Sequence, residues 1–202
     1  MKKLSVLFVL ILLLAVGGMA HAVDIASGER ELQKTVLEQM KEVYPDAEFI
    51  DLSLEEYEAL IEERVEEQTA QSEIGTFAAA PPVTGVSIVR VRSGNGVESV
   101  GNKTRTSPVR GQVIIETIVD GYGSDTHYFG GFPIRKTDPN FTFSVQGIDY
   151  NGDRIIDAFR HEVSFNSDTQ IGWGSSRQYK LEARSHNSPF NTMSDSITIV
   201  HE

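Results

Sequence analysis

The chain has 202 residues, no cysteine and a formal net charge of −11. Without cysteine, it can form neither a disulfide-stapled scaffold nor a cysteine nucleophile, and its stability must come from a packed core and from any bound ions. The acidic balance offers no basic face for a polyanion, so we expect no nucleic-acid partner.

The first 22 residues have the three parts of a secretory signal peptide. They are the charged Met-Lys-Lys start, an apolar run over residues 4–16, and an Ala-His-Ala ending at Ala22. The apolar run is shorter than the roughly 20 residues that cross a bilayer. We therefore expect a secreted, bacterial protein that is cleaved after Ala22 and has no stable membrane insertion after cleavage.

Residues 23–75 form an acidic segment with 16 acidic and four basic residues, a net charge of −12. The rest of the chain, residues 76–202, has 13 acidic and 12 basic residues and is nearly neutral. The chain therefore consists of two electrostatically different parts.

The acidic segment has the apolar periodicity of two amphipathic helices. The first is expected to end before Pro45, because proline disfavours a helical residue before it. Ser53 and Glu56 have the spacing of a capping box and predict the start of a second helix, through about Gln68. Residues 48–52, between the helices, look extended. The apolar positions that define the two stripes are Leu32, Val36, Met40 and Val43, then Leu54, Tyr57, Ile61 and Val65.

Residues 76–82 read Thr-Phe-Ala-Ala-Ala-Pro-Pro, which predicts an extended and accessible linker. Three interpretations of the acidic segment remain open at this point. It is a helical appendage packed on the larger domain, a pro-segment removed after export, or a weakly ordered acidic stalk.

From residue 83 to residue 202 the apolar pattern changes to period two, which is typical of strands. Gly130, Gly131 and Pro133 indicate an edge or a bulge in the third of these strands. Short strands separated by turn signals predict a mainly β fold, a β-sandwich preceded by the acidic two-helix segment. The expected strands are residues 86–91, 112–119, 127–134, 141–148, 155–165, 178–185 and 197–201.

The last two expected strands carry Tyr179, Leu181 and Ala183 at alternate positions, followed by a turn and the run Ser-Ile-Thr-Ile-Val at 196–200. This stretch resembles the end of a fibronectin-type-III-like or other immunoglobulin-like module. The resemblance implies an immunoglobulin-like sandwich in which Tyr179 occupies the tyrosine-corner position. It implies nothing about function.

One loop, residues 149–157, has the residue types of a calcium site. Oxygen donors at positions 1, 3, 5 and 9, with a backbone carbonyl at position 7, suit Ca²⁺. Position 6 is Arg154 instead of glycine, and position 12 is Arg160 instead of glutamate, so a true EF-hand is not expected. The expected ligands are Asp149, Asn151, Asp153, Asp157 and the backbone oxygen of Ile155.

The same loop has a second interpretation that needs no metal. Asn151-Gly152 between two alternating runs is a strong signal for a type I′ hairpin turn. Asp149 and Asp153 would then only flank the turn.

Other candidate sites are weaker. His127, His161 and His186 are far apart in the sequence and lack ligand spacing, so no zinc site is expected. Nothing marks a catalytic residue, and there is no Gly-x-Ser-x-Gly elbow. Trp173 and the pair Phe129 and Phe132 stand beside glycines, where aromatic rings stack on sugars or fill a core.

The sequence thus predicts an exported, non-enzymatic binding or structural module for an unknown extracellular protein or carbohydrate, with one Ca²⁺ as a stabiliser. The alternative is a secreted effector or toxin-like protein, matured by proteolytic removal of the acidic segment. A carbohydrate-active or other hydrolytic enzyme is a third class that no motif supports.

Overall fold

A computed structural model of the chain describes residues 36–71, 81–165, 176–186 and 188–202. The expected signal peptide, residues 76–80 of the expected linker and Trp173 lie outside the described residues.

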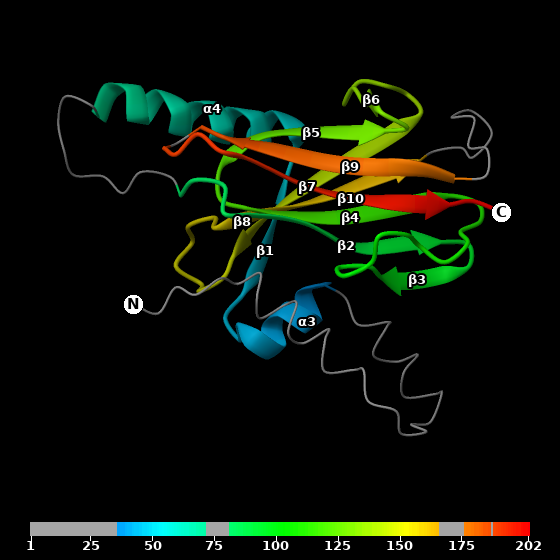
Figure 1. The fold of residues 1–202 in the computed structure, drawn as a ribbon. Coiled ribbons are helices and arrows are strands. Elements are labelled where there is room, and N and C mark those ends of the chain that lie inside the picture. The colour runs from blue at the N-terminus through cyan, green and yellow to red at the C-terminus, as the bar shows by residue number, and fades with distance from the viewer. Residues whose placement is uncertain (1–35, 72–80, 166–175, 187) are drawn as a thin grey trace.

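The described residues form two antiparallel sheets, and the prediction of a mainly β fold is confirmed (Figure 1). The larger sheet has six strands in the order β1–β7–β8–β4–β2–β3, and the smaller has four in the order β10–β9–β5–β6. The larger comprises β1 (Glu48–Leu52), β7 (Phe141–Asp149), β8 (Ala158–Phe165), β4 (Val113–Asp120), β2 (Gly85–Ser93) and β3 (Gly96–Ser99). The smaller comprises β10 (Thr192–Val200), β9 (Ser176–Ser185), β5 (Gly123–Phe129) and β6 (Phe132–Pro133).

The strand order is that of an immunoglobulin-like sandwich. Strands β2, β4, β7 and β8 take the places of A, B, D and E, and β5, β9 and β10 take those of C, F and G. Strands β1 and β3 extend the two edges of the larger sheet, and β6 extends the smaller one. Tyr179 lies on the F-like strand, β9, as the resemblance implies.

Alternate residues of each strand point between the sheets and form the main core. This period explains why β8 buries Phe159, His161, Val163 and Phe165, whereas the alternate residues Arg160, Glu162 and Ser164 are only partly buried. From the smaller sheet, β9 buries Leu181 and Ala183 in the same way.

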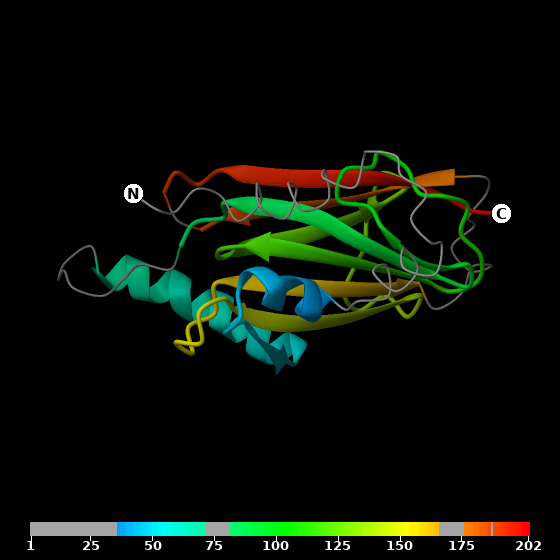
Figure 2. The same ribbon diagram turned by 90° about the horizontal axis from the view of Figure 1, so that it is seen from below.

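The described part of the acidic segment, residues 36–71, packs on the larger sheet. Helix α3 (Val36–Val43) ends before Pro45 and buries Val36 and Met40 against Ile118 and Ile148 on the outer face (Figure 2). Strand β1 pairs antiparallel with β7 along its whole length, from Glu48 opposite Asp149 to Leu52 opposite Val145. The extended piece between the two helices is therefore the edge strand of the sheet.

Helix α4 (Leu54–Gln71) begins with the predicted capping box. The Ser53 amide donates to Glu56 Oε2 at 2.8 Å, and the Glu56 amide donates to Ser53 Oγ at 3.1 Å. The helix buries Tyr57 and Ile61 in a cluster with Val145 and Phe159 of the larger sheet. These contacts place α4 over the side of the sandwich where β5 faces β7 (Figure 1).

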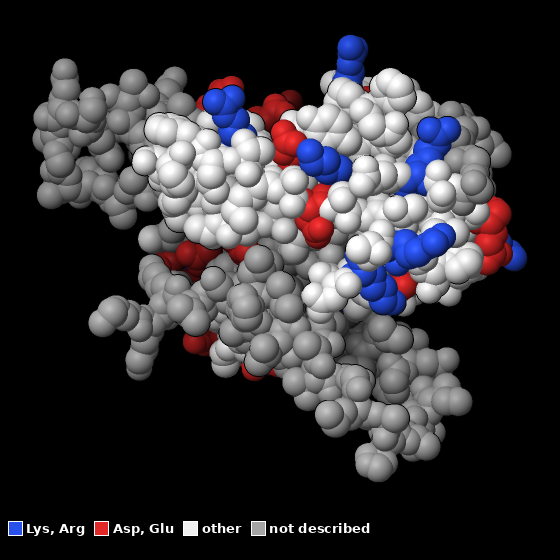
Figure 3. All heavy atoms as spheres, in the orientation of Figure 1, with Lys and Arg blue, Asp and Glu red and all other residues white. Residues whose placement is uncertain are grey.

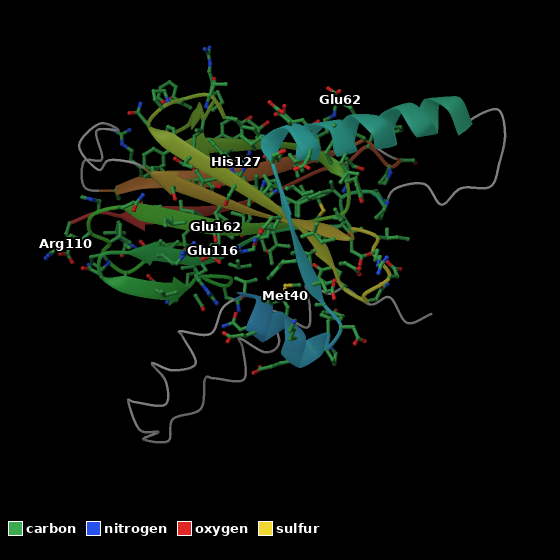
Figure 4. All side chains as sticks on the ribbon, turned by 180° about the vertical axis from the view of Figure 1, so that it is seen from behind. Met40, Glu62, Arg110, Glu116, His127 and Glu162 are labelled. Carbon is green, nitrogen blue, oxygen red and sulfur yellow. The ribbon has the colours of Figure 1, made fainter. Side chains whose placement is uncertain are left out.

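A buried charge network on the outer face holds the middle strands together. Glu116 of β4 is 1% exposed and is paired with Arg92 Nε at 2.6 Å and with Arg160 at 3.0 Å. Glu162, beside it on β8, also pairs with Arg92, and Figure 4 shows the two glutamates close together. Arg160 in turn lies over the ring of Phe49 on β1, so the network continues to the edge strand.

Three expected strands differ from the structure, and the last of them, β10, begins at Thr192 and not at residue 197. The run 127–134 is a hairpin, since Gly130 and Gly131 both have positive φ and turn the chain between β5 and β6. Strand β8 begins at Ala158 and not at residue 155. Residues 150–157 form the connection from β7, so the interpretation of Asn151-Gly152 as a two-residue hairpin turn is wrong.

Acidic and basic side chains are mixed on the face shown in Figure 3. Among the described residues, no helix combines the length and the apolar character needed to cross a membrane.

Candidate functional site

A buried cluster of titratable side chains lies between the sheets below α4. Asp125 and His127 are two residues apart on β5 and point to the same side of it, whereas His161 comes from β8 of the opposite sheet. Asp125 Oδ2 lies 2.8 Å from His127 Nε2 and 3.9 Å from His161 Nδ1. All three side chains are 1–2% exposed, and Figure 4 shows His127 near the start of α4.

Neighbouring groups orient each member of the Asp125–His127 pair. Tyr57 of α4 donates its hydroxyl to Asp125 Oδ1 at 2.8 Å, and Lys136 Nζ lies 3.2 Å from the same oxygen. On the other side of the pair, His127 Nδ1 lies 2.6 Å from the hydroxyl of Tyr179. Tyr179, expected at the tyrosine-corner position, therefore directs its hydroxyl to a histidine on the neighbouring strand.

Burial and charge set the protonation of the cluster. Burial acts to raise the pKa of Asp125, but His161, His127 and Lys136 outweigh it and hold that pKa well below its ordinary value. Burial lowers the pKa of His161 to about 4. Burial, together with the charge of Asp125, raises the pKa of Tyr57. At neutral pH the cluster thus contains an ionised carboxylate, a neutral His161 and a protonated phenol.

Two polar atoms beside the cluster have no hydrogen-bond partner among the described residues. They are His161 Nε2 and the hydroxyl of Thr117, and both are buried. Thr117 lies opposite His161 in the β4–β8 register. Buried polar atoms are nearly always hydrogen-bonded, so the unpaired imidazole nitrogen calls for an explanation.

The expectation that the histidines lie apart is wrong for His127 and His161, whose ring centroids are 5.5 Å apart. Sequence spacing missed them because they come from strands of facing sheets. The available signal was a polar residue in an apolar row: His161 occupies the inward position between Phe159 and Val163 on β8. The third of these histidines, His186, lies outside the cluster.

Two adjoining pockets open beside the cluster. The first, of about 540 Å³, lies between α4 and β5 and has Asp125 and Lys136 in its wall. The second, of about 420 Å³, is lined by residues of β5 and β9 and by Phe190. Ser124 and His186 line both pockets, and Ser124 Oγ lies 2.7 Å from His186 Nε2. The pockets therefore adjoin at this pair, and we refer to the two together as the α4–Phe190 groove.

The predicted calcium loop is closed by its own side chains. Asp149 is 1% exposed, and its two oxygens accept the amides of Asn151, Gly152 and Arg154 at 2.6–3.0 Å. Burial of Asp149 acts to raise its pKa, but these amide hydrogen bonds outweigh it and lower that pKa. Asp157 Oδ2 accepts the amide of Tyr150 at 2.9 Å.

The other loop residues are more exposed. Asn151 Oδ1 accepts the Asp153 amide at 3.0 Å, and Asp153 Oδ1 accepts the Ile155 amide at 2.8 Å. The Ile155 side chain is 54% exposed. Arg154 has a φ of 68°, the left-handed conformation that usually requires glycine at this position. Calcium binding by this loop stays a prediction.

Among the described residues, the only set of three Asp, Glu, His or Cys side chains with donor atoms all within 4.8 Å of one another is Asp125, His127 and His161.

A family model described as a domain of unknown function (DUF4879) matches residues 78–199, which is more than half of the chain and leaves out the acidic segment. No curated protein matches the chain.

Proposed function

The chain belongs to the DUF4879 family, and from its geometry we propose that it is an exported, non-enzymatic binding module that takes a carbohydrate in the α4–Phe190 groove. The observation that carries this proposal is that two pockets adjoin at the Ser124–His186 pair, with an exposed aromatic ring in the wall of one of them.

The groove has the two kinds of group that a sugar needs. Phe190 is 63% exposed and offers a ring face for stacking. Along the wall, Ser124, Thr126, Glu182 and Arg184 offer hydroxyl, carboxylate and guanidinium groups for sugar hydroxyls. A few placed polar groups beside an apolar surface are the usual composition of a small-ligand site.

Charge favours a neutral ligand over a strongly anionic one. At the α4 end, Glu58, Glu62 and Asp125 face a single lysine, Lys136. An anionic polymer would be repelled there, whereas a neutral sugar can donate hydroxyl hydrogens to the carboxylates. The signal-peptide pattern of residues 1–22 supports encounter with such ligands outside the cell.

A matched pair of aromatic variants tests the proposal. Phe190→Ala removes the ring at the groove, and Phe132→Ala removes a ring that is 74% exposed at the β5–β6 hairpin, outside both pockets. In a binding screen against neutral and anionic polysaccharides, we expect retention of a neutral polysaccharide that Phe190→Ala weakens at least about tenfold, whereas Phe132→Ala binds like the wild type.

Three results would reject the carbohydrate proposal. They are the absence of binding to any polysaccharide, equal loss in both variants, and selective binding to protein ligands. A Trp173→Ala variant extends the screen to the aromatic residue that the sequence singles out.

A second candidate is an effector matured by removal of the acidic segment. It is favoured by the family match, which begins at residue 78, and by the position of Tyr57 over the Asp125–His161 cluster. Against it stand the pairing of β1 with β7 and the buried side chains of α3 and α4, which would leave apolar surface behind.

The N-terminus of the exported protein separates the two candidates. A start at residue 23 supports the binding module, because α4 supplies four residues of the groove. A start between residues 72 and 82, with loss of the segment from the purified protein, supports the matured effector and rejects the groove as described.

A further inference from the structure

We propose that Asp125, His127 and His161 bind a divalent transition-metal ion of the Zn²⁺ class. This inference does not depend on the carbohydrate proposal. One carboxylate and two imidazoles are a donor set that suits zinc and its neighbours in the first transition row. The observation that carries the proposal is the buried cluster itself, whose three potential donor atoms all lie within 4.8 Å of one another. The proposed donor of His161 is Nδ1, 3.9 Å from Asp125 Oδ2, and the unpaired nitrogen of the same ring is Nε2.

The two donor distances from Asp125 need only small adjustments for a metal ion. Zinc bonds of about 2.0–2.2 Å in tetrahedral geometry separate neighbouring donor atoms by about 3.3 Å. The donors around Asp125 Oδ2 lie at 2.8 Å for His127 Nε2 and 3.9 Å for His161 Nδ1, on either side of that value. Side-chain shifts of about half an ångström would bring both into range.

Hydrogen bonds already orient two of the three proposed ligands. In zinc sites, the second nitrogen of a ligating histidine and the free oxygen of a ligating carboxylate are usually hydrogen-bonded. Here the hydroxyl of Tyr179 lies 2.6 Å from His127 Nδ1, and Tyr57 donates to Asp125 Oδ1. A metal on His127 Nε2 requires the ring proton on Nδ1, from which it would be donated to the Tyr179 oxygen.

The electrostatics of the cluster both help and oppose a cation. Ionised Asp125 and neutral His161 have the protonation that ligands require, since a metal competes with protons for both. Lys136 opposes the ion because its ammonium lies 3.2 Å from Asp125 Oδ1. Its side chain is 24% exposed, and Glu58, 3.9 Å away, offers it another partner.

Asp125 also lines the pocket between α4 and β5, which gives an ion a route to the cluster. The competing interpretation is a closed hydrogen-bonded network without a metal ion, in which the positive charge of Lys136 alone compensates the negative charge of Asp125. The two interpretations differ in the effect of Lys136: removal of this lysine strengthens a metal site, but it only destabilises a closed network.

The test is a titration of the purified, EDTA-treated exported protein with Co²⁺, which reports nitrogen and oxygen ligation through visible d–d absorption, followed by displacement with Zn²⁺. We expect one equivalent of Co²⁺ to bind and Zn²⁺ to displace it. His161→Gln should weaken binding at least about 100-fold, and Lys136→Gln should strengthen it about tenfold. The control His186→Gln, altered at a histidine outside the cluster, should bind like the wild type.

Absence of saturable Co²⁺ binding by the wild type overturns the proposal without any variant. Equal binding by wild type and His161→Gln, or loss of binding in His186→Gln, also overturns it. If His161→Gln does not fold, Lys136→Gln decides, because unchanged or weaker Co²⁺ binding in that variant contradicts a metal site at Asp125.

Discussion

Replacing Tyr57 by phenylalanine tests whether the acidic segment is held to the sandwich by the Asp125 cluster. Tyr57 is 2% exposed, and its ring packs against Phe159 and His161 at centroid distances of 5.0 and 5.3 Å. Phenylalanine keeps this packing and removes only the hydroxyl that donates to Asp125 Oδ1 at 2.8 Å.

The expected loss follows from the charge of the acceptor. A hydrogen bond to a charged group contributes about 1.5–3 kcal/mol to folding. Lys136 remains 3.2 Å from the same oxygen, so Asp125 is not left unpaired and the lower end applies. We expect Tyr57→Phe to reduce the free energy of unfolding by about 1.5 kcal/mol, whereas Tyr57→Ala, which also empties the ring site, should cost about 3–5 kcal/mol.

Urea denaturation followed by circular dichroism measures both variants. With an m value of about 2 kcal/mol/M, Tyr57→Phe should lower the midpoint by about 0.75 M. Tyr128→Phe is the control, because Tyr128 lies on β5, the strand of Asp125, and its hydroxyl has no hydrogen bond among the described residues. A Tyr57→Phe midpoint equal to that of the control would refute the reasoning, and so would a Tyr57→Ala midpoint equal to that of the wild type.

Three further predictions concern pH, backbone and calcium. In the folded, metal-free protein the pKa of His161 is about 4, whereas in the unfolded chain it has the ordinary value of about 6.5. The stability that the neutral imidazole contributes to the fold is therefore complete above about pH 6.5 and is lost as the pH falls toward 4. The loss is on the order of 3 kcal/mol, and urea melts should show a flatter pH profile for His161→Gln; equal profiles would contradict a neutral buried imidazole. Gly121→Ala places a Cβ 2.1 Å from the Pro82 carbonyl oxygen at a φ of +91°, and it should lower the free energy of unfolding by about 2 kcal/mol or more. The loss should clearly exceed that of Gly96→Ala, where the new Cβ has no atom within 4 Å. Millimolar Ca²⁺ should raise the thermal midpoint relative to EDTA, Asp157→Ala should abolish this rise and Arg154→Gly should enlarge it; identical melts would reject the calcium loop.

Local patterns predicted most of the elements. The period of two located the main strands, the Ser53–Glu56 spacing identified the start of α4, and Pro45 marked a limit for α3. These features depend on residues within a few positions of one another, so the sequence contains all the information that they need.

The ends of strands were less predictable. Residues 155–157 were expected to begin a strand, but the Ile155 amide donates to Asp153 Oδ1 and the Ile156 carbonyl accepts the Tyr122 hydroxyl, so these residues belong to the loop. A hydrogen-bonded loop and a strand can have the same order of residue types. The choice between them depends on the register of β7 with β8, which is set along the whole sheet.

The sequence by itself determined the mainly β class, the contrast between an acidic segment and a nearly neutral remainder, and the pattern of an export leader, because composition and short-range periodicity are properties of the chain alone. Only the tertiary structure decided that residues 48–52 form an edge strand and that His161 meets Asp125 and His127. Those contacts join strands from opposite sheets, or segments about 100 residues apart. Such contacts depend on how the sheets face each other, which no local spacing specifies.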